Sequence, residues 1–176
     1  MKTEAKVLLL VGGAWYHDQP EHREILSGVL GSRFDLTMAG YATRVLTPEN
    51  LSKYDVIADY TSWWEPTRPQ YLALLEAVAG GKGFACLHPA TASFMNSSGY
   101  HDMVGGSFVH HDPNKLFKVQ LGERKHFGTG ELILEDHSIT EGIEDFEIQD
   151  ELFVVDGDQT RSHILARAEG HPVIWT

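Results

Sequence analysis

The stretch GKGFACLHPAT, residues Gly81 to Thr91, combines a short apolar run with a turn and the start of a helix. A turn at the end of a buried strand is where α/β enzymes often carry a catalytic group. Cys86, the only cysteine, lies inside the apolar run. His88 stands at the expected strand end, because Pro89 suits the first position of a helix. The stretch therefore predicts a strand over 83–87, with His88 rather than Cys86 on the turn.

The chain before this stretch alternates between strand and helix patterns. Lys6 to Val11 is continuously apolar, which is typical of a strand buried on both faces of a parallel sheet. Apolar residues then recur at helical spacing, at Ile25, Leu26, Val29 and Leu30 and again at Tyr71, Leu74, Leu75 and Val78. Further strands are predicted over 34–38 and 56–58. The alternation predicts an α/β fold with a mostly parallel central sheet and helices on both faces.

The pattern changes after about Asp112. The remaining chain shows short β-like segments over 116–121, 131–134, 152–155 and 173–175, with turns between them. Nothing in the 176 residues resembles an interdomain linker, so a single domain is predicted.

Composition excludes several classes of partner. The net charge of −11 and the absence of a basic cluster argue against nucleic acid. The apolar run at Val7–Val11 is too short to span a membrane, and one cysteine cannot form an internal disulfide, so we expect a cytoplasmic protein. The segment Gly12–Tyr16 lacks the third spaced glycine of a dinucleotide site and carries two bulky aromatic residues, so no nucleotide cofactor is expected.

Candidate site residues follow the predicted strands, because ligands of parallel sheets collect at the carboxyl ends of the strands. They are His17 and Asp18, then Trp63 and Trp64, then His88 and Thr91, and further along the chain His111 and Glu151. Imidazole and carboxylate groups bind transition metals or exchange protons near neutral pH, and tryptophan can stack on a sugar ring. For each histidine alone, a structural role remains open.

The motifs taken together resemble the trehalose-utilisation (ThuA-like) family. They are the runs at 6–13 with His17-Asp18, 83–88, 104–108 with His111, 136–143 and 150–153. The resemblance implies a flavodoxin-like, three-layer fold of the class I glutamine amidotransferase-like superfamily, in which a histidine replaces the amidotransferase cysteine. His88 is the matching residue. The loop reads His110-His111-Asp112-Pro113, so either histidine could be the functional one.

The resemblance also sets expectations for the end of the chain. Similar proteins continue beyond His171–Thr176 into a further strand and a closing helix. We therefore expect one ThuA-like domain over residues 1–176 that lacks these elements. An exposed sheet edge would favour a homodimer or lower the stability.

The leading functional hypothesis is an enzyme that acts on a disaccharide or keto-sugar by proton transfer, hydrolysis or elimination, with a partner oxidoreductase supplying the keto-sugar. His88, His17 and Glu151 are the predicted catalytic residues, and Asp18, Trp63, Trp64 and Thr91 are the predicted substrate contacts. His17, His88, His111 and Glu151 are expected to bind a divalent transition metal such as zinc, manganese or nickel. The alternatives are a non-catalytic sugar-binding or regulatory module, and an amidase-like hydrolase that uses Cys86.

Overall fold

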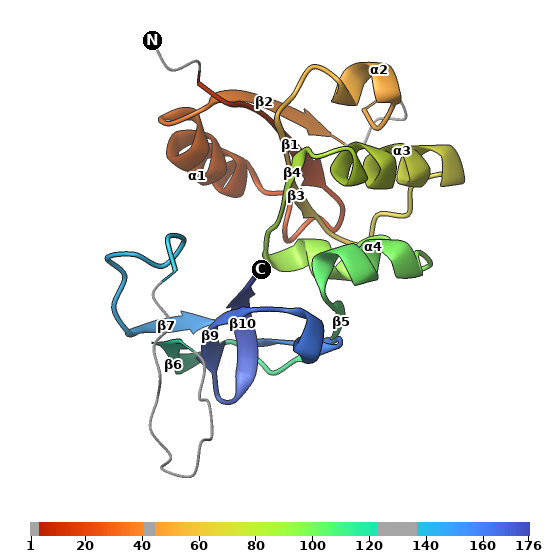
Figure 1. The fold of residues 1–176 in the computed structure, drawn as a ribbon. Helices are drawn as coiled ribbons and strands as arrows, with labels where there is room; N and C mark the ends of the chain where they lie inside the picture. Colours follow the sequence, from red (N-terminus) through yellow and green to blue (C-terminus); the bar gives the residue numbers. More distant parts are fainter. Residues whose placement is uncertain (1–3, 41–44, 123–136) are drawn as a thin grey trace. The chain divides into compact units, whose positions relative to one another are not determined.

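The computed structural model describes residues 4–40, 45–122 and 137–176. The chain divides into two compact units, unit 1 (Met1–Val104) and unit 2 (Gly105–Thr176). Unit 1 is a mixed α/β structure with a parallel sheet, and unit 2 consists mainly of antiparallel strands (Figure 1). That the two act as a single domain over residues 1–176 stays a prediction.

Unit 1 is built around four parallel strands in the order β2-β1-β3-β4. They are β1 (Lys6–Gly12), β2 (Asp35–Gly40), β3 (Val56–Thr61) and β4 (Gly83–Cys86). Leu9 of β1 lies opposite Met38 of β2 and Ala58 of β3. Residues 7–12 of β1 are all buried, because a strand flanks β1 on each side and helices cover the sheet. The predicted parallel strands are confirmed.

Helices lie on both faces of this sheet, with α1 (Pro20–Gly31) on one side and α3 (Arg68–Ala79) on the other (Figure 1). The short helices α2 (Pro48–Leu51) and α4 (Ser98–Val104) contact α3. A proline occupies the first turn of α1, α2 and α3, where its missing N–H leaves no helical hydrogen bond unmade. Among the described residues, no helix combines the length and the apolar character needed to cross a membrane.

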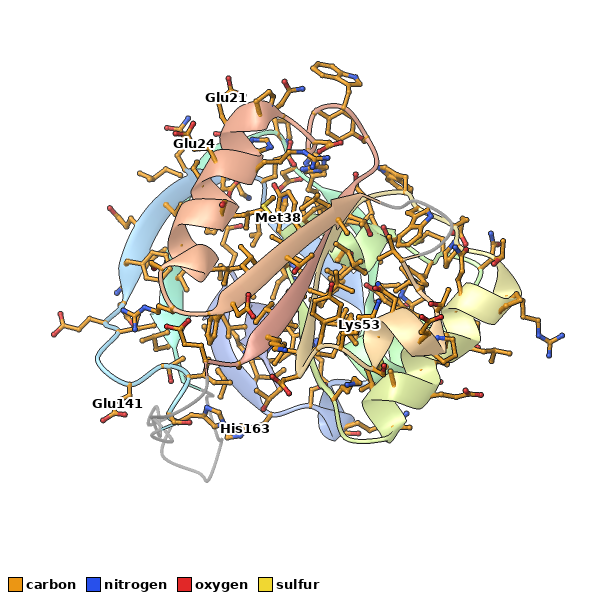
Figure 2. All side chains as sticks on the ribbon, turned by 90° about the horizontal axis from the view of Figure 1, so that it is seen from above. Glu21, Glu24, Met38, Lys53, Glu141 and His163 are labelled. Carbon is orange, nitrogen blue, oxygen red and sulfur yellow. The ribbon has the colours of Figure 1, made fainter. Side chains whose placement is uncertain are left out.

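The predicted apolar stripe of α1 is only partly buried. Leu26 and Leu30 pack against the buried β1 residues, whereas Ile25 and Val29 are 62% and 63% exposed. Successive helix residues point about 100° apart, so the sheet covers one of these two rows and leaves the other to solvent. Figure 2 shows the Glu24 side chain of the same helix pointing away from the sheet.

The described residues of unit 2 form two antiparallel sheets. The larger has the strand order β10-β9-β6-β7, and the smaller pairs β5 with β8. The strands are β5 (Ser107–His111), β6 (Lys115–Leu121), β7 (Phe146–Asp150), β8 (Phe153–Asp156), β9 (Ile164–Ala168) and β10 (His171–Trp175). Inward residues Phe117, Val119 and Leu121 alternate along β6 and pack with Leu152 and Ala166. This alternation is expected for a sheet with one buried face.

Three of the four β segments predicted after Asp112 are confirmed as β6, β8 and β10. The fourth, over 131–134, lies outside the described residues. The strands β5, β7 and β9 were not predicted from the sequence. β7 is missed because most of its residues are exposed and polar residues interrupt it, so its apolar period is weak.

Candidate functional site

Two loops of unit 1 meet closely at the carboxyl edge of the parallel sheet. The Ala14 N–H donates to Ser62 Oγ at 2.9 Å, and the Ser62 N–H donates to the Gly12 carbonyl at 3.1 Å. A Cβ atom on Gly13 would lie 1.9 Å from the Ser62 carbonyl oxygen, and the φ angle of Gly13 is +107°. Gly13 is therefore needed for the approach of these loops.

His17 and His88 come together at this edge. Their ring centres lie 5.2 Å apart, at an interplanar angle of 69°. His17 follows β1 in a turn where its N–H donates to the Ala14 carbonyl, and His88 opens the 3₁₀ turn η1 (His88–Ala92) after β4. His88 has a φ of +32°, which is rare for a residue with a side chain. The predicted meeting of these histidines is confirmed within unit 1.

The spacing of the two rings suits a shared metal ion or a shared proton. A zinc–nitrogen bond of about 2.0–2.1 Å puts each ring centre about 3 Å from the ion, so two tetrahedral ligands have ring centres roughly 5 Å apart. The observed 5.2 Å fits this arrangement. Two imidazoles are fewer protein ligands than zinc sites usually have, so further groups would have to complete the shell.

A group of aromatic side chains lies next to His17. The rings of Tyr16 and His17 lie 4.9 Å apart, and Trp15 packs edge-on against Tyr16 at 5.8 Å. The Trp63 indole N–H donates to the Tyr16 hydroxyl at 3.1 Å. Trp15, Tyr16 and Trp63 are 76%, 48% and 51% exposed, and together we call them the aromatic surface. Trp15 and Tyr16 were not among the predicted site residues, although the sequence AWYHD directly after a strand indicates that they lie at the strand end.

The other three predicted substrate contacts of unit 1 have internal partners. Asp18 Oδ1 accepts from Arg23 Nε at 2.7 Å and lies 2.6 Å from its NH2 group. Trp64 is half-buried and packs edge-on against Phe94. Thr91 is buried, and its hydroxyl donates to the His88 carbonyl at 3.2 Å. Thr91 thus supports the turn that carries His88.

Cys86 is the last residue of β4, so it lies before the turn, as predicted. The residue as a whole is half-buried, but its thiol faces Asp59 and Tyr100. Burial raises the pKa of the Cys86 thiol well above its usual value, and the Asp59 charge raises it further. A thiol that stays protonated is a poor nucleophile, which argues against the amidase-like alternative.

Unit 2 brings His111 and Glu151 together. His111 Nε2 lies 3.8 Å from Glu151 Oε2, and the His111 ring stacks on Phe153 at 5.4 Å. His111 Nδ1 lies 2.8 Å from the Asp112 carbonyl. A carbonyl can only accept, so Nδ1 carries a hydrogen, and in the neutral ring Nε2 can bind a metal or a proton.

The geometry distinguishes His111 from its neighbour His110. A β-bulge between Phe108 and His110 shifts the register of β5, and His110 pairs along the strand with Val154. His111, and not His110, is the histidine that lies next to Glu151. The prediction that the His17–His88 pair and the His111–Glu151 pair form one site remains a prediction.

Comparison with known proteins identifies relatives of the whole chain. Residues 6–176 match the family ThuA, described as trehalose utilisation. A ThuA-like protein from Bacteroides uniformis has a similar solved structure (TM-score 0.77, 16% identity), covering 100% of this chain and 79% of that one. A ThuA-like protein from Parabacteroides merdae is also similar (TM-score 0.78, 14% identity), covering 99% and 75%. These identities show a shared fold alone.

The sequence matches no curated protein. The family match extends over both units, from the first residue of β1 to the last residue of the chain. The chain belongs to the ThuA, or trehalose-utilisation, family.

Proposed function

We propose that this protein acts in carbohydrate metabolism, on a keto-sugar or disaccharide, by proton transfer at the carboxyl edge of the unit 1 sheet. The observation that carries the proposal is the His17–His88 pair, which lies beside the aromatic surface. Imidazoles exchange protons near neutral pH, and exposed aromatic rings can cover the apolar face of a sugar ring. The family description, trehalose utilisation, agrees with a sugar substrate.

Unit 1 is proposed to have the flavodoxin-like fold of the class I glutamine amidotransferase-like superfamily. The strand order β2-β1-β3-β4 supports this assignment, because flavodoxin-like sheets begin with the order 2-1-3-4. In this proposal His88 occupies the turn after β4 in place of a cysteine nucleophile. The protein would then have no amidotransferase activity.

The proposed reaction begins at a carbon beside a ketone, where the carbonyl makes the hydrogen acidic. A base, Glu151 or His17, takes this proton, and the electron pair left behind forms the enolate, whose oxygen His88 stabilises by hydrogen bonding. The electron pair then forms a carbon–carbon double bond while the bond to the glycosidic oxygen breaks. This oxygen leaves with a proton from an imidazolium group. General-base assistance of this kind accelerates a reaction by about 10² to 10⁴.

The ketone has to come from another protein. The sequence lacks a dinucleotide-binding fingerprint, so we propose that a partner oxidoreductase oxidises the sugar first. A disaccharide without a ketone has no acidified hydrogen at the neighbouring carbon. It would therefore not react.

As the alternative to direct roles of the two imidazoles in proton transfer and hydrogen bonding, a divalent transition metal is proposed to complete the site. His17 and His88 would hold it in unit 1, and His111 and Glu151 are proposed as further ligands on the grounds of sequence. Such an ion would polarise the ketone oxygen as a Lewis acid. The chemistry of the donor set, three imidazoles and one carboxylate, suits zinc, manganese or nickel.

Metal analysis of the untagged full chain tests the ligand set. We expect about one ion per chain in the wild type, and much less in His88→Ala and Glu151→Gln. His110→Ala is the matched control, because it removes an imidazole next to the proposed ligand His111. Substoichiometric metal that His88→Ala leaves unchanged would refute the metal site. Full metal content in Glu151→Gln alone would refute a site shared by the two pairs.

The reaction is tested by product release from a 3-keto-disaccharide and from trehalose, together with solvent deuterium exchange beside the ketone. We expect turnover of the keto-sugar only, and near-complete loss in His88→Ala and Glu151→Gln while both variants stay folded. Equal turnover of trehalose would refute the mechanism. Tight binding of sugar without turnover or exchange would instead favour a non-catalytic sugar-binding module.

A further inference from the structure

Asp59 is a fully buried carboxylate in β3 that the proposed reaction does not use. Its Oδ1 accepts from the Thr61 N–H at 2.9 Å and from the Thr61 hydroxyl at 2.7 Å. Its Oδ2 accepts from the Tyr100 hydroxyl at 2.8 Å. Among the described residues, none of the ion pairs includes Asp59. In the described part of the chain, the charge is thus stabilised by the neutral donors of Thr61 and Tyr100.

The hydrogen bonds of Asp59 lead to both sides of η1, the turn that carries His88. On one side, the Thr61 hydroxyl lies 2.9 Å from the hydroxyl of Ser93, which directly follows η1. On the other, the Tyr100 hydroxyl lies 3.2 Å from the carbonyl of Ala90, inside η1. The Asp59 backbone carbonyl also accepts from the N–H of Leu87, just before the turn. An uncommon conformation such as that of His88 persists only where surrounding contacts hold it.

Tyr100 has one hydroxyl hydrogen and two oxygen acceptors within reach, and its hydroxyl also contacts the neutral Cys86 thiol, a much weaker acceptor. An ionised Asp59 takes this hydrogen, because a charged acceptor forms the stronger bond. A neutral group at position 59 can instead donate to the Tyr100 oxygen, and the tyrosine hydrogen is then available to the Ala90 carbonyl. The charge at position 59 therefore decides whether η1 receives this hydrogen bond.

We propose that Asp59 is a positioning residue for His88 and sets the geometry of the η1 turn through Thr61 and Tyr100. The inference rests on the proposed function, in which His88 touches the substrate. The titratable side chains that face Asp59 are Cys86 from β4 and Tyr100 from α4. Burial raises the pKa of the Cys86 thiol and that of the Tyr100 hydroxyl above their usual values, so both groups stay neutral while Asp59 titrates. An asparagine at position 59 keeps the shape and removes the charge: its carbonyl oxygen can accept from Thr61, and its amide nitrogen donates to the Tyr100 oxygen.

The first test follows the turn itself and needs no activity. In the full chain, the ¹³C shifts of the Tyr100 ring carbon that bears the hydroxyl and of the Ala90 carbonyl are measured from pH 4.5 to 8.5. We expect both to shift with one common midpoint in the wild type, and we expect this step to disappear in Asp59→Asn. Asp35→Asn, an exposed carboxylate at the start of β2, is the matched control and should keep the step. An unchanged step in Asp59→Asn would overturn the proposal.

The second test measures deuterium exchange of the keto-sugar. We expect Asp59→Asn to lower kcat about tenfold, equivalent to about 1.4 kcal/mol, with KM unchanged and an altered pH profile. The inference would be overturned if Asp59→Asn showed the wild-type kcat and an unchanged pH profile of kcat while His88→Ala was inactive. The proposed function would then still stand. If the wild type shows no exchange at all, the proposed function fails, and the ¹³C titration still decides whether Asp59 controls the turn.

Discussion

Replacing Asp59 by asparagine is expected to change the free energy of unfolding in a way that depends on pH. Compared with the wild type, the variant should gain stability as the pH rises from acid to neutral. Burial raises the pKa of Asp59 from 3.8 to about 6, although its hydrogen bonds with Thr61 and Tyr100 oppose the rise. Because the folded pKa is the higher one, the stability gained from the bound proton is complete below about pH 4 and is lost as the pH rises through about 6. A difference of about 2 pKa units amounts to about 3 kcal/mol in the free energy of unfolding.

The assay is urea unfolding at several pH values between 4 and 7, followed by tryptophan fluorescence. Trp15, Trp63 and Trp64 of the four tryptophans belong to unit 1, so the probe reports mainly on the unit that holds Asp59. The stability of Asp59→Asn minus that of the wild type should increase by about 2.4 kcal/mol from pH 4 to pH 7, slightly less than the full amount because part of the unfolded chain is still protonated at position 59 at pH 4. Other titrating groups cancel in this difference. Asp35→Asn should show little change. A difference that stays constant with pH, or that falls, would refute the reasoning.

Three further outcomes are expected. Gly13→Ala should lower the free energy of unfolding by more than about 2 kcal/mol, because the added Cβ would collide with Ser62 and the φ angle is positive. Gly28→Ala, at an open position in the middle of α1, should raise the free energy of unfolding by up to about 1 kcal/mol. Urea unfolding of both variants checks this. Cys86→Ala should keep its exchange activity and lose roughly 1 kcal/mol of stability, and stoichiometric labelling of the native thiol with loss of activity would count against this. Trp63→Ala should weaken sugar binding at least about fivefold in calorimetry, and equal affinity would remove the stacking role.

The parallel sheet of unit 1 was accessible from the sequence because burial on both faces leaves continuous apolar runs such as residues 6–11. The glycine and proline residues at the ends of strands and helices were equally informative, since Pro89 correctly indicated that His88 lies on the turn and Cys86 before it. The outer row of α1 was predicted less well. Spacing in the sequence shows that Ile25 and Val29 share a row, but it does not show whether a partner covers that row.

The candidate site was predicted only in part. That His17 and His88 meet follows from a rule of topology, because the carboxyl ends of parallel strands share one edge. The choice between His110 and His111 could not be made in this way. It depends on a β-bulge, which changes the register of β5 by one residue and cannot be seen as a period in the sequence.

The sequence by itself determined the family, the order of strands and helices in unit 1 and the turn that carries His88, because these features depend on local patterns of polarity, glycine and proline. Only the tertiary structure decided that Asp59 is buried against Tyr100, 41 residues further along the chain. The same is true of the hydrogen bond from the Trp63 indole to the Tyr16 hydroxyl. Such contacts form between side chains from distant segments. Local periodicity shows which face a residue occupies, but the packing of the fold selects the group that it meets.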